Sequence, residues 1–310
     1  MIAMSSVADK GDTDARTILK KVVPTLRYEY LVAGVIGGVL STFVVHPFDL
    51  LKIRLSVNDR KEGRPLYRGL RHAAQVIWHA ENIRGFYRGV TANCIGSGSA
   101  WGLYFVFYNA TKSWMSDGDS STHLGPVKHM QAAIQSGMLT LLFTNPVFVV
   151  KTRMCLRYGK VDDEYGSLLR SIKSLYRTNG ILGFYKGFIP GLIGTSHGAV
   201  QFMVYEEMKK WMGKKERLSN AEYLISSSVS KAIAVVCTYP YQVVRARLQD
   251  QHRIYSGNLD VIQTTYKHEG MSGFYKGLMP NILRVTPAAA VTFLVYENVV
   301  ALLMGPSVVK

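Results

Sequence analysis

The sequence has few cysteines and lacks the short motifs that mark common catalytic or metal sites. Its three cysteines, Cys94, Cys155 and Cys237, lie far apart and form no CxxC pair, which argues against a disulfide framework or a zinc site. No GxGxxG, P-loop, HExxH or nucleophile-elbow motif occurs either. We therefore expect a protein that is not an enzyme and that has no metal or cofactor of its own.

Acidic residues are also scarce. The chain has 21 Asp and Glu against 37 Lys and Arg, a formal net charge of +16. Such an excess suits a phosphate-bearing partner or an anionic membrane surface. Because the basic residues are spread along the chain and no zinc-finger, RNA-recognition or basic-zipper pattern appears, we do not expect nucleic-acid binding.

A further absence is a long uninterrupted apolar run. Residues 31–45 are apolar for 15 positions before His46, which is short for a simple spanning helix of about 20 residues. Glycine, serine, threonine or a charge interrupts the other apolar segments, which lie near 95–108, 130–150, 188–205, 224–241 and 282–303. Interrupted segments of this kind are expected where helices line a polar path. The pattern predicts six membrane helices rather than one anchor.

What the sequence does contain is a unit that occurs three times with a period just under a hundred residues. Its first part is a proline followed by basic residues five and seven positions later: Pro47, Lys52 and Arg54; Pro146, Lys151 and Arg153; Pro240, Arg245 and Arg247. Its second part is Gly-Phe-Tyr-basic-Gly, at 85–89, 183–187 and 273–277. Two matched parts that occur in the same order three times predict three similar hairpin units.

Together with Pro47-Phe48-Asp49-Leu50-Leu51-Lys52, the tripled motif resembles the mitochondrial carrier family, from about Tyr28 to Leu303. The resemblance implies an all-α membrane protein with six transmembrane helices in three pseudo-threefold repeats and short matrix helices. It implies a multi-pass protein of the mitochondrial inner membrane, and we expect a monomer. The expected organisation is a tail at 1–27 and repeats at 28–115, 128–214 and 220–304.

The resemblance further implies a gate on each side of the membrane. At the matrix-gate positions only Asp49 is acidic, so we expect an ion pair with Lys151, a hydrogen bond from Lys52 to Gln242, and a cation–π contact between Phe148 and Arg245. The cytosolic-gate positions also form an incomplete set: Tyr108, Lys112, Tyr205, Glu206, Lys209, Tyr296 and Glu297.

Substrate-binding residues are expected on the second helix of each repeat. The family's contact points fall on Gly96 with Ser97, on Gly194 with Thr195, and on Arg284, and Asn281 lies near them. Either glycine can instead serve close helix packing. A guanidinium at this depth needs an anionic partner, so Arg284 is the expected substrate anchor. Trp101 is a candidate for stacking on a flat ring.

The family also binds cardiolipin at the second sequence element. The corresponding residues are Arg88 with Gly89, Lys186 with Gly187, and Lys276 with Gly277. Free amides at a helix start and a cationic side chain suit a phosphate. A basic residue that extends along the membrane interface is the other interpretation.

Within the family, the carriers of folate and FAD are the most similar, through stretches such as 186–191, 194–198, 238–252 and 284–287. The expected cargo is therefore a small anion, folate or FAD, moved by alternating access. Carriers of NAD or pyrimidine nucleotides are the next interpretation. The depleted gates also leave open a membrane scaffold that does not transport.

Overall fold

The computed structural model describes residues 28–59, 64–115, 126–158, 167–211 and 220–304. In these ranges every regular element is a helix, as the all-α prediction requires. The predicted tail at 1–27 lies outside the described residues.

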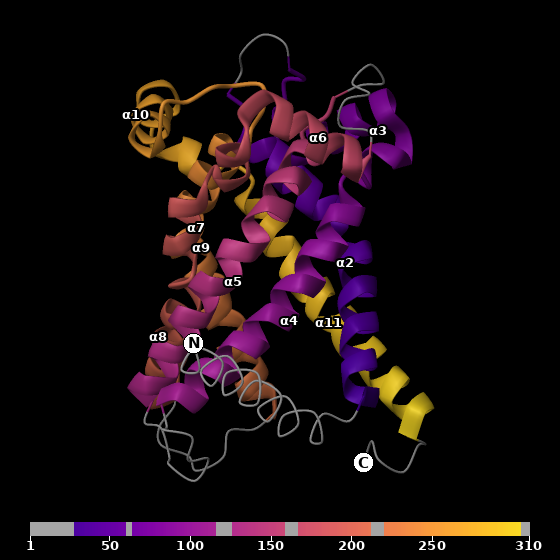
Figure 1. Ribbon diagram of the computed structural model, residues 1–310, viewed down its shortest axis with the longest axis vertical. Helices are drawn as coiled ribbons and strands as arrows, with labels where there is room; N and C mark the ends of the chain where they lie inside the picture. The colour runs from indigo at the N-terminus through magenta and orange to yellow at the C-terminus, as the bar shows by residue number, and fades with distance from the viewer. Residues whose placement is uncertain (1–27, 60–63, 116–125, 159–166, 212–219, 305–310) are drawn as a thin grey trace, which may run out of the picture. The chain divides into compact units, whose positions relative to one another are not determined.

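Each repeat consists of a long helix with an internal proline, a short helix, and a second long helix (Figure 1). Repeat 1 contains α2 (Tyr28–Ser56), α3 (Leu70–Phe86) and α4 (Val90–Met115). Repeat 2 contains α5 (Pro126–Cys155), α6 (Leu168–Asn179), α7 (Phe188–Gly194) and α8 (His197–Trp211). Repeat 3 contains α9 (Asn220–Gln249), α10 (Asn258–Glu269) and α11 (Leu278–Met304). The 3-10 turns η2 (Ile181–Tyr185) and η3 (Met271–Tyr275) hold the Gly-Phe-Tyr elements of repeats 2 and 3.

The second long helix of repeat 2 is interrupted. Helix α7 ends at Gly194 and α8 begins at His197. The amides of Thr195 and Ser196 bond to carbonyls three residues earlier, and their hydroxyls bond to the same carbonyls. A tightened turn of this kind inside a helix often marks a hinge. The interruption therefore falls at Thr195, one of the predicted substrate positions.

The described residues divide into two compact units, one of residues 28–41 and 288–304 and one of residues 42–287. Within the first, the Ser41 hydroxyl donates to the carbonyl oxygen of Ala288 at 3.0 Å. All the polar contacts described below lie within the second unit.

The core of the second unit forms where each short helix packs on the end of the preceding long helix. In repeat 1, Leu50 and Leu51 of α2 pack against Ala73 and Ile77 of α3. Val149, Val150 and Met154 of α5 contact Leu175 of α6, and Val244 of α9 contacts Val261 of α10 and Phe274. These buried apolar contacts fix the short helices near the ends of α2, α5 and α9.

Farther from those ends, the long helices expose large apolar side chains such as Phe43, Val44 and Phe143. By length and composition, Ile36–Ser56 and Val127–Cys155 are suited to crossing a membrane. Exposed apolar surface on such helices is suited to contact with lipid.

Candidate functional site

Three buried arginines connect the repeats in a closed order. They are the residues seven positions after each repeat proline, and each is almost fully buried. In each case Nε donates to a backbone carbonyl at the end of the next long helix: Arg54 to Cys155 at 3.0 Å, Arg153 to Gln249 at 3.3 Å, and Arg247 to Ser56 at 3.0 Å. Because the third bond returns to the first repeat, the ends of α2, α5 and α9 are held together.

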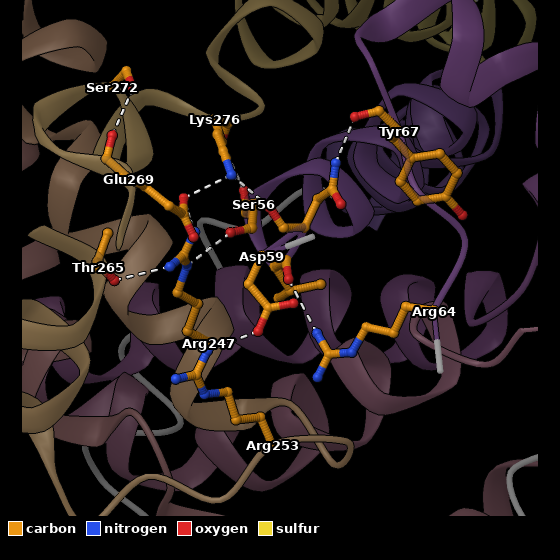
Figure 2. A network of polar contacts seen from close by, with 12 residues as sticks. Ser56, Asp59, Arg64, Tyr67, Arg247, Arg253, Thr265, Glu269, Ser272 and Lys276 are labelled. Carbon is orange, nitrogen blue, oxygen red and sulfur yellow. Dashed lines mark hydrogen bonds and ion pairs between the residues drawn. The ribbon is translucent and has the colours of Figure 1, made fainter. Parts of the chain in front are cut away.

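In two repeats the buried arginine shares a glutamate with a second cation. Glu81 contacts Arg54 at 2.8 Å and Arg88 at 2.9 Å. Glu269 contacts Arg247 and Lys276, each at 2.7 Å, as Figure 2 shows. In repeat 2 the corresponding residue is Asn179, whose Oδ1 accepts a hydrogen bond from Arg153 at 2.8 Å. Repeat 2 thus has an amide where the other repeats have a carboxylate.

The cations of the Gly-Phe-Tyr-basic-Gly elements therefore have protein partners in repeats 1 and 3. Besides its glutamate, Arg88 donates to the carbonyl of Arg157, and Lys276 donates to the carbonyl of Asn58. Their contact with cardiolipin, and that of Lys186, stays a prediction.

Each glycine that follows these cations packs against the next long helix. A Cβ on Gly89 would lie 3.2 Å from the Lys151 carbonyl, and one on Gly277 would lie 2.7 Å from the Lys52 carbonyl. The same two glycines have φ of +80° and +85°, and Gly187 has +74°. Glycine is required here by close backbone approach and by a positive φ.

Outside the candidate membrane segments, two carboxyl groups of this network have shifted pKa values. Burial alone would raise the pKa of Glu269, but hydrogen bonds from Arg247 and Lys276 outweigh it, so the pKa is lowered. For Asp250 burial dominates and raises the pKa, although Arg64 lies 2.7 Å away. Figure 2 shows a neighbouring pair, Arg253 and Asp59, also 2.7 Å apart, which connects repeats 1 and 3.

Asp49 lies at the centre of a second polar cluster. Its carboxylate is only 4% exposed and contacts Lys151 at 3.2 Å and the guanidinium of Arg284. Asn93 donates to the same carboxylate at 3.1 Å. The predicted pair of Asp49 with Lys151 is thus present, while the gate function assigned to it stays a prediction.

The other two contacts expected at the matrix-gate positions are also present. Lys52 donates to Oε1 of Gln242 at 2.6 Å. The guanidinium carbon of Arg245 lies 5.9 Å from the Phe148 ring centre, and Lys151 Nζ lies 6.0 Å from it. Arg245 also donates to Oδ1 of Asn145 at 3.0 Å. An amide and an aromatic ring therefore replace two carboxylates.

Arg284 has a different partner from the ones considered for it from sequence. From the sequence we expected the substrate to supply its anionic partner; the structure pairs the guanidinium with Asp49. Its Nε is buried and has no hydrogen-bond partner among the described residues. The guanidinium is thus paired with Asp49 while the side chain keeps 35% of its surface exposed, and its contact with a substrate stays a prediction.

The two contact-point glycines allow aromatic side chains to approach their helices. A Cβ on Gly96 would lie 3.2 Å from the Phe148 ring, and one on Gly194 would lie 2.8 Å from the Tyr241 ring. This geometry supports close helix packing. Ser97 donates weakly to Asn93 at 3.5 Å, and Asn281 is buried. Substrate contact at Gly96, Ser97, Gly194, Thr195 and Asn281 stays a prediction.

Trp101 belongs to an aromatic series on α4. Its indole is 64% exposed and lies edge-on to Tyr104, with ring centres 6.4 Å apart. Tyr104 stacks in turn on Tyr108, whose hydroxyl bonds to His129 at 2.9 Å. Aromatic rings stack on one another in an offset manner, so this series could hold the flat ring of a substrate, and stacking on Trp101 stays a prediction.

The cytosolic-gate positions are less well defined by the structure. The side chains of Tyr296 and Glu297 lie outside the described residues. Lys112 and Lys209 are exposed on α4 and α8, and Tyr205 and Glu206 are half-buried on α8. In the described part of α4 and α8, no ion pair joins Glu206 to either lysine, so the cytosolic gate stays a prediction.

Several residues of these networks were not predicted from the sequence. The basic residue seven after each proline was part of the repeat pattern, but its glutamate or asparagine partner, four residues before Gly-Phe-Tyr, was not recognised. The residue before each proline was also missed: His46, Asn145 and Tyr239 donate to carbonyls of Arg88, Phe184 and Lys276. Their fixed position next to a repeated proline could have revealed them.

Comparison with known proteins shows the same threefold division. The family described as mitochondrial carrier protein matches residues 26–119, 122–216 and 216–307. A chloroplastic folate transporter of Arabidopsis thaliana is 38% identical over 89% of this chain and 96% of that protein. The chloroplastic nicotinamide adenine dinucleotide transporter 1 of Arabidopsis thaliana is 36% identical over 86% of this chain and 89% of that protein. The mitochondrial FAD carrier protein of Saccharomyces cerevisiae is 30% identical over 86% of this chain and 94% of that protein.

A membrane transporter of three tandem repeats is the class that the fold and these matches define. The chain belongs to the mitochondrial carrier family. Members of this family are transporters of small molecules rather than enzymes, and the all-α fold with its three repeats is that of the family.

Proposed function

We propose that this carrier moves folate, FAD or both between the cytosol and the mitochondrial matrix by alternating access. The observation that carries the proposal is the charge of the Asp49 cluster. Lys151, Arg245 and Arg284 all lie within electrostatic range of Lys52. Asp49 is the carboxylate that pairs with two of these cations, Lys151 and Arg284, in the described residues. Excess positive charge inside a membrane helix bundle favours an anionic cargo.

A flat ring and a multiply charged end are features that folate and FAD share. Folate ends in carboxylates, and FAD carries a pyrophosphate, so the same cations can serve either. The aromatic series of Trp101, Tyr104 and Tyr108 offers a surface for the pterin or flavin ring. The named activities of the Arabidopsis folate transporter and the yeast FAD carrier support the same two substrates.

NAD is the alternative cargo, because the NAD transporters of Arabidopsis are about as similar to this chain. NAD also has a pyrophosphate and flat rings. Its positively charged nicotinamide lowers the net negative charge, which makes it a poorer match for an excess of cations. The pyrimidine nucleotides are a further alternative of the same chemistry.

The proposed location is the mitochondrial inner membrane, with the chain as a monomer in contact with cardiolipin. The yeast relative is named as mitochondrial, whereas two of the plant relatives are named as chloroplastic. The chloroplast envelope is therefore the alternative location.

Uptake by liposomes that contain the purified protein tests the proposal. Labelled FAD, a labelled reduced folate and labelled NAD are offered separately, with protein-free liposomes as the control. We expect saturable uptake of FAD or folate that exceeds the uptake of NAD. Folded protein that takes up none of the three would contradict the proposal and favour a scaffold, while preferential uptake of NAD would favour the alternative cargo.

A further inference from the structure

Lys231 is a cation in the middle of α9 that the contacts described so far do not involve. It lies nine residues before Pro240, and the corresponding residues of the other repeats are Gly38 and Gly137. A Cβ on Gly137 would contact Thr195 at 3.4 Å, and one on Gly38 would meet nothing within 4 Å. Repeat 3 therefore has a long charged side chain where the other repeats have only a hydrogen.

The face of α9 on which Lys231 lies is the polar one. Val229, Ile233 and Val236 form the exposed apolar stripe of this part of the helix. With 3.6 residues per turn, Lys231 falls on the opposite side, in line with Ala234 and Thr238, which are buried. Thr238 in turn bonds to His197 of α8 at 3.0 Å. Lys231 is thus directed toward neighbouring helices and not toward lipid.

Lys231 lies near a second cation, Arg284 of α11. Val235, one turn after Lys231, packs in one apolar cluster with Ile282, two residues before Arg284. The charge of Arg284 is therefore close enough to act on Lys231. Among the described residues, no carboxylate and no hydrogen-bond acceptor contacts the ammonium group. A lysine without a partner at this depth in a membrane protein is costly, and it is found mainly where it binds a ligand or an ion.

A second observation that points to a bound anion, independent of Lys231, comes from Arg284. One of its terminal nitrogens contacts Asp49, but its Nε is buried and has no partner in the part of the chain that the structure describes. A buried N–H group normally has an acceptor, and leaving it without one costs about 1–3 kcal/mol. Among the described residues, therefore, the Nε of Arg284 has no acceptor and the charge of Lys231 has no counter-ion.

We propose that Lys231 and the partly exposed guanidinium of Arg284 form one anion site, which binds a group with two adjacent negative charges. The site fits either a pyrophosphate or a pair of carboxylates, and in it Lys231 determines preference for doubly charged substrates. This inference rests on the proposed transport of an anionic solute and adds a binding residue on the first helix of repeat 3.

Binding of inorganic pyrophosphate to the purified full-length protein tests the site without transport. Thermal-shift titrations compare the wild type with Lys231→Met, which keeps a flexible chain but removes the charge, and with Lys231→Arg, which keeps the charge. Lys173→Met, on the exposed face of α6, is the matched control. Loss of one charged contact corresponds to about tenfold or more in affinity. We expect that loss for Lys231→Met, and wild-type or near wild-type binding for Lys231→Arg and Lys173→Met.

Uptake by liposomes distinguishes the two sources of the charge. If the site holds the pyrophosphate of FAD, we expect Lys231→Met to raise the KM for FAD uptake tenfold, with a smaller change in kcat. If the site holds carboxylates, we expect the same change in the uptake of folate. Lys231→Gly, which restores the residue of the other repeats, replaces Lys231→Met if the latter fails to fold.

Two results would overturn the inference: absence of pyrophosphate binding by the wild type, or equal binding by the wild type and the variant without the charge. A wild-type protein that binds pyrophosphate through Lys231 but takes up none of the three substrates would contradict the proposed function alone.

Discussion

Asn82 adopts a backbone conformation that favours glycine. Its φ is +54° and ψ is −163°, and the equivalent residues of repeats 2 and 3, Gly180 and Gly270, have nearly the same angles. A side chain in this region costs about 1–3 kcal/mol. We expect Asn82→Gly to raise the melting temperature, with a gain of about 1 kcal/mol, and Gly180→Asn to lower it. Equal or lower stability of Asn82→Gly in thermal unfolding would show that the Asn82 side chain offsets the strain.

Asp49 is the residue on which most of the polar cluster depends. Asp49→Asn would leave Lys151 and Arg284 without the carboxylate that both contact, and breaking a buried pair in this way costs about 3–5 kcal/mol. We expect a large loss of uptake in liposomes and a lower melting temperature. Gln242→Ala, which removes a single hydrogen bond to Lys52, is the comparison and should cost about 1 kcal/mol. Wild-type uptake by Asp49→Asn would refute the gate assignment.

At the scale of elements, the interruption between α7 and α8 lies beside a close contact of α7 with α9. A methyl group on Gly194 would lie 2.8–3.0 Å from the Tyr241 ring, whereas one on Gly198 would meet nothing within 4 Å. Gly194→Ala should therefore overpack this contact at a cost of about 1–3 kcal/mol and reduce uptake. Gly198→Ala is the matched control and should leave the stability and the uptake unchanged. Equal behaviour of the two variants would show that this contact is not tight.

The contact of α10 with α9 predicts a dependence of stability on pH. Because the pKa of Glu269 is lowered in the folded protein, its stabilising contribution is complete above the ordinary glutamate pKa of 4.5. The contribution is lost as the pH falls from there through the folded pKa. Melting curves between pH 3 and pH 7 should therefore show a steeper acid loss for the wild type than for Glu269→Gln. Parallel curves would indicate that the ion pairs of Glu269 with Arg247 and Lys276 do not stabilise the fold.

At the scale of the whole molecule, the sequence predicted the helices, the three repeats and the contacts at the matrix-gate positions. It could do so because a proline and a basic residue five positions later, as in Pro47 and Lys52, recur at fixed spacing in all three repeats, and a repeat fixes which positions are equivalent. The partner of Arg284 could not be predicted, because spacing does not say where a long side chain ends. The interruption at Thr195 was missed as well. It lies next to Gly194, which packs against Tyr241 of another repeat, and spacing along the chain does not show such a contact.

The central claim is that a cationic cluster around Asp49 binds and moves an anionic cargo. Uptake of labelled FAD and folate by liposomes containing Arg284→Lys, compared with the wild type, tests it most directly. Lysine keeps the charge and can retain the pair with Asp49, but it lacks the planar guanidinium that can contact Asp49 and a ligand together. We expect a near wild-type melting temperature with at least a tenfold loss of uptake for whichever cargo the wild type carries, about the effect of one charged hydrogen bond. Undiminished uptake by Arg284→Lys would contradict the account.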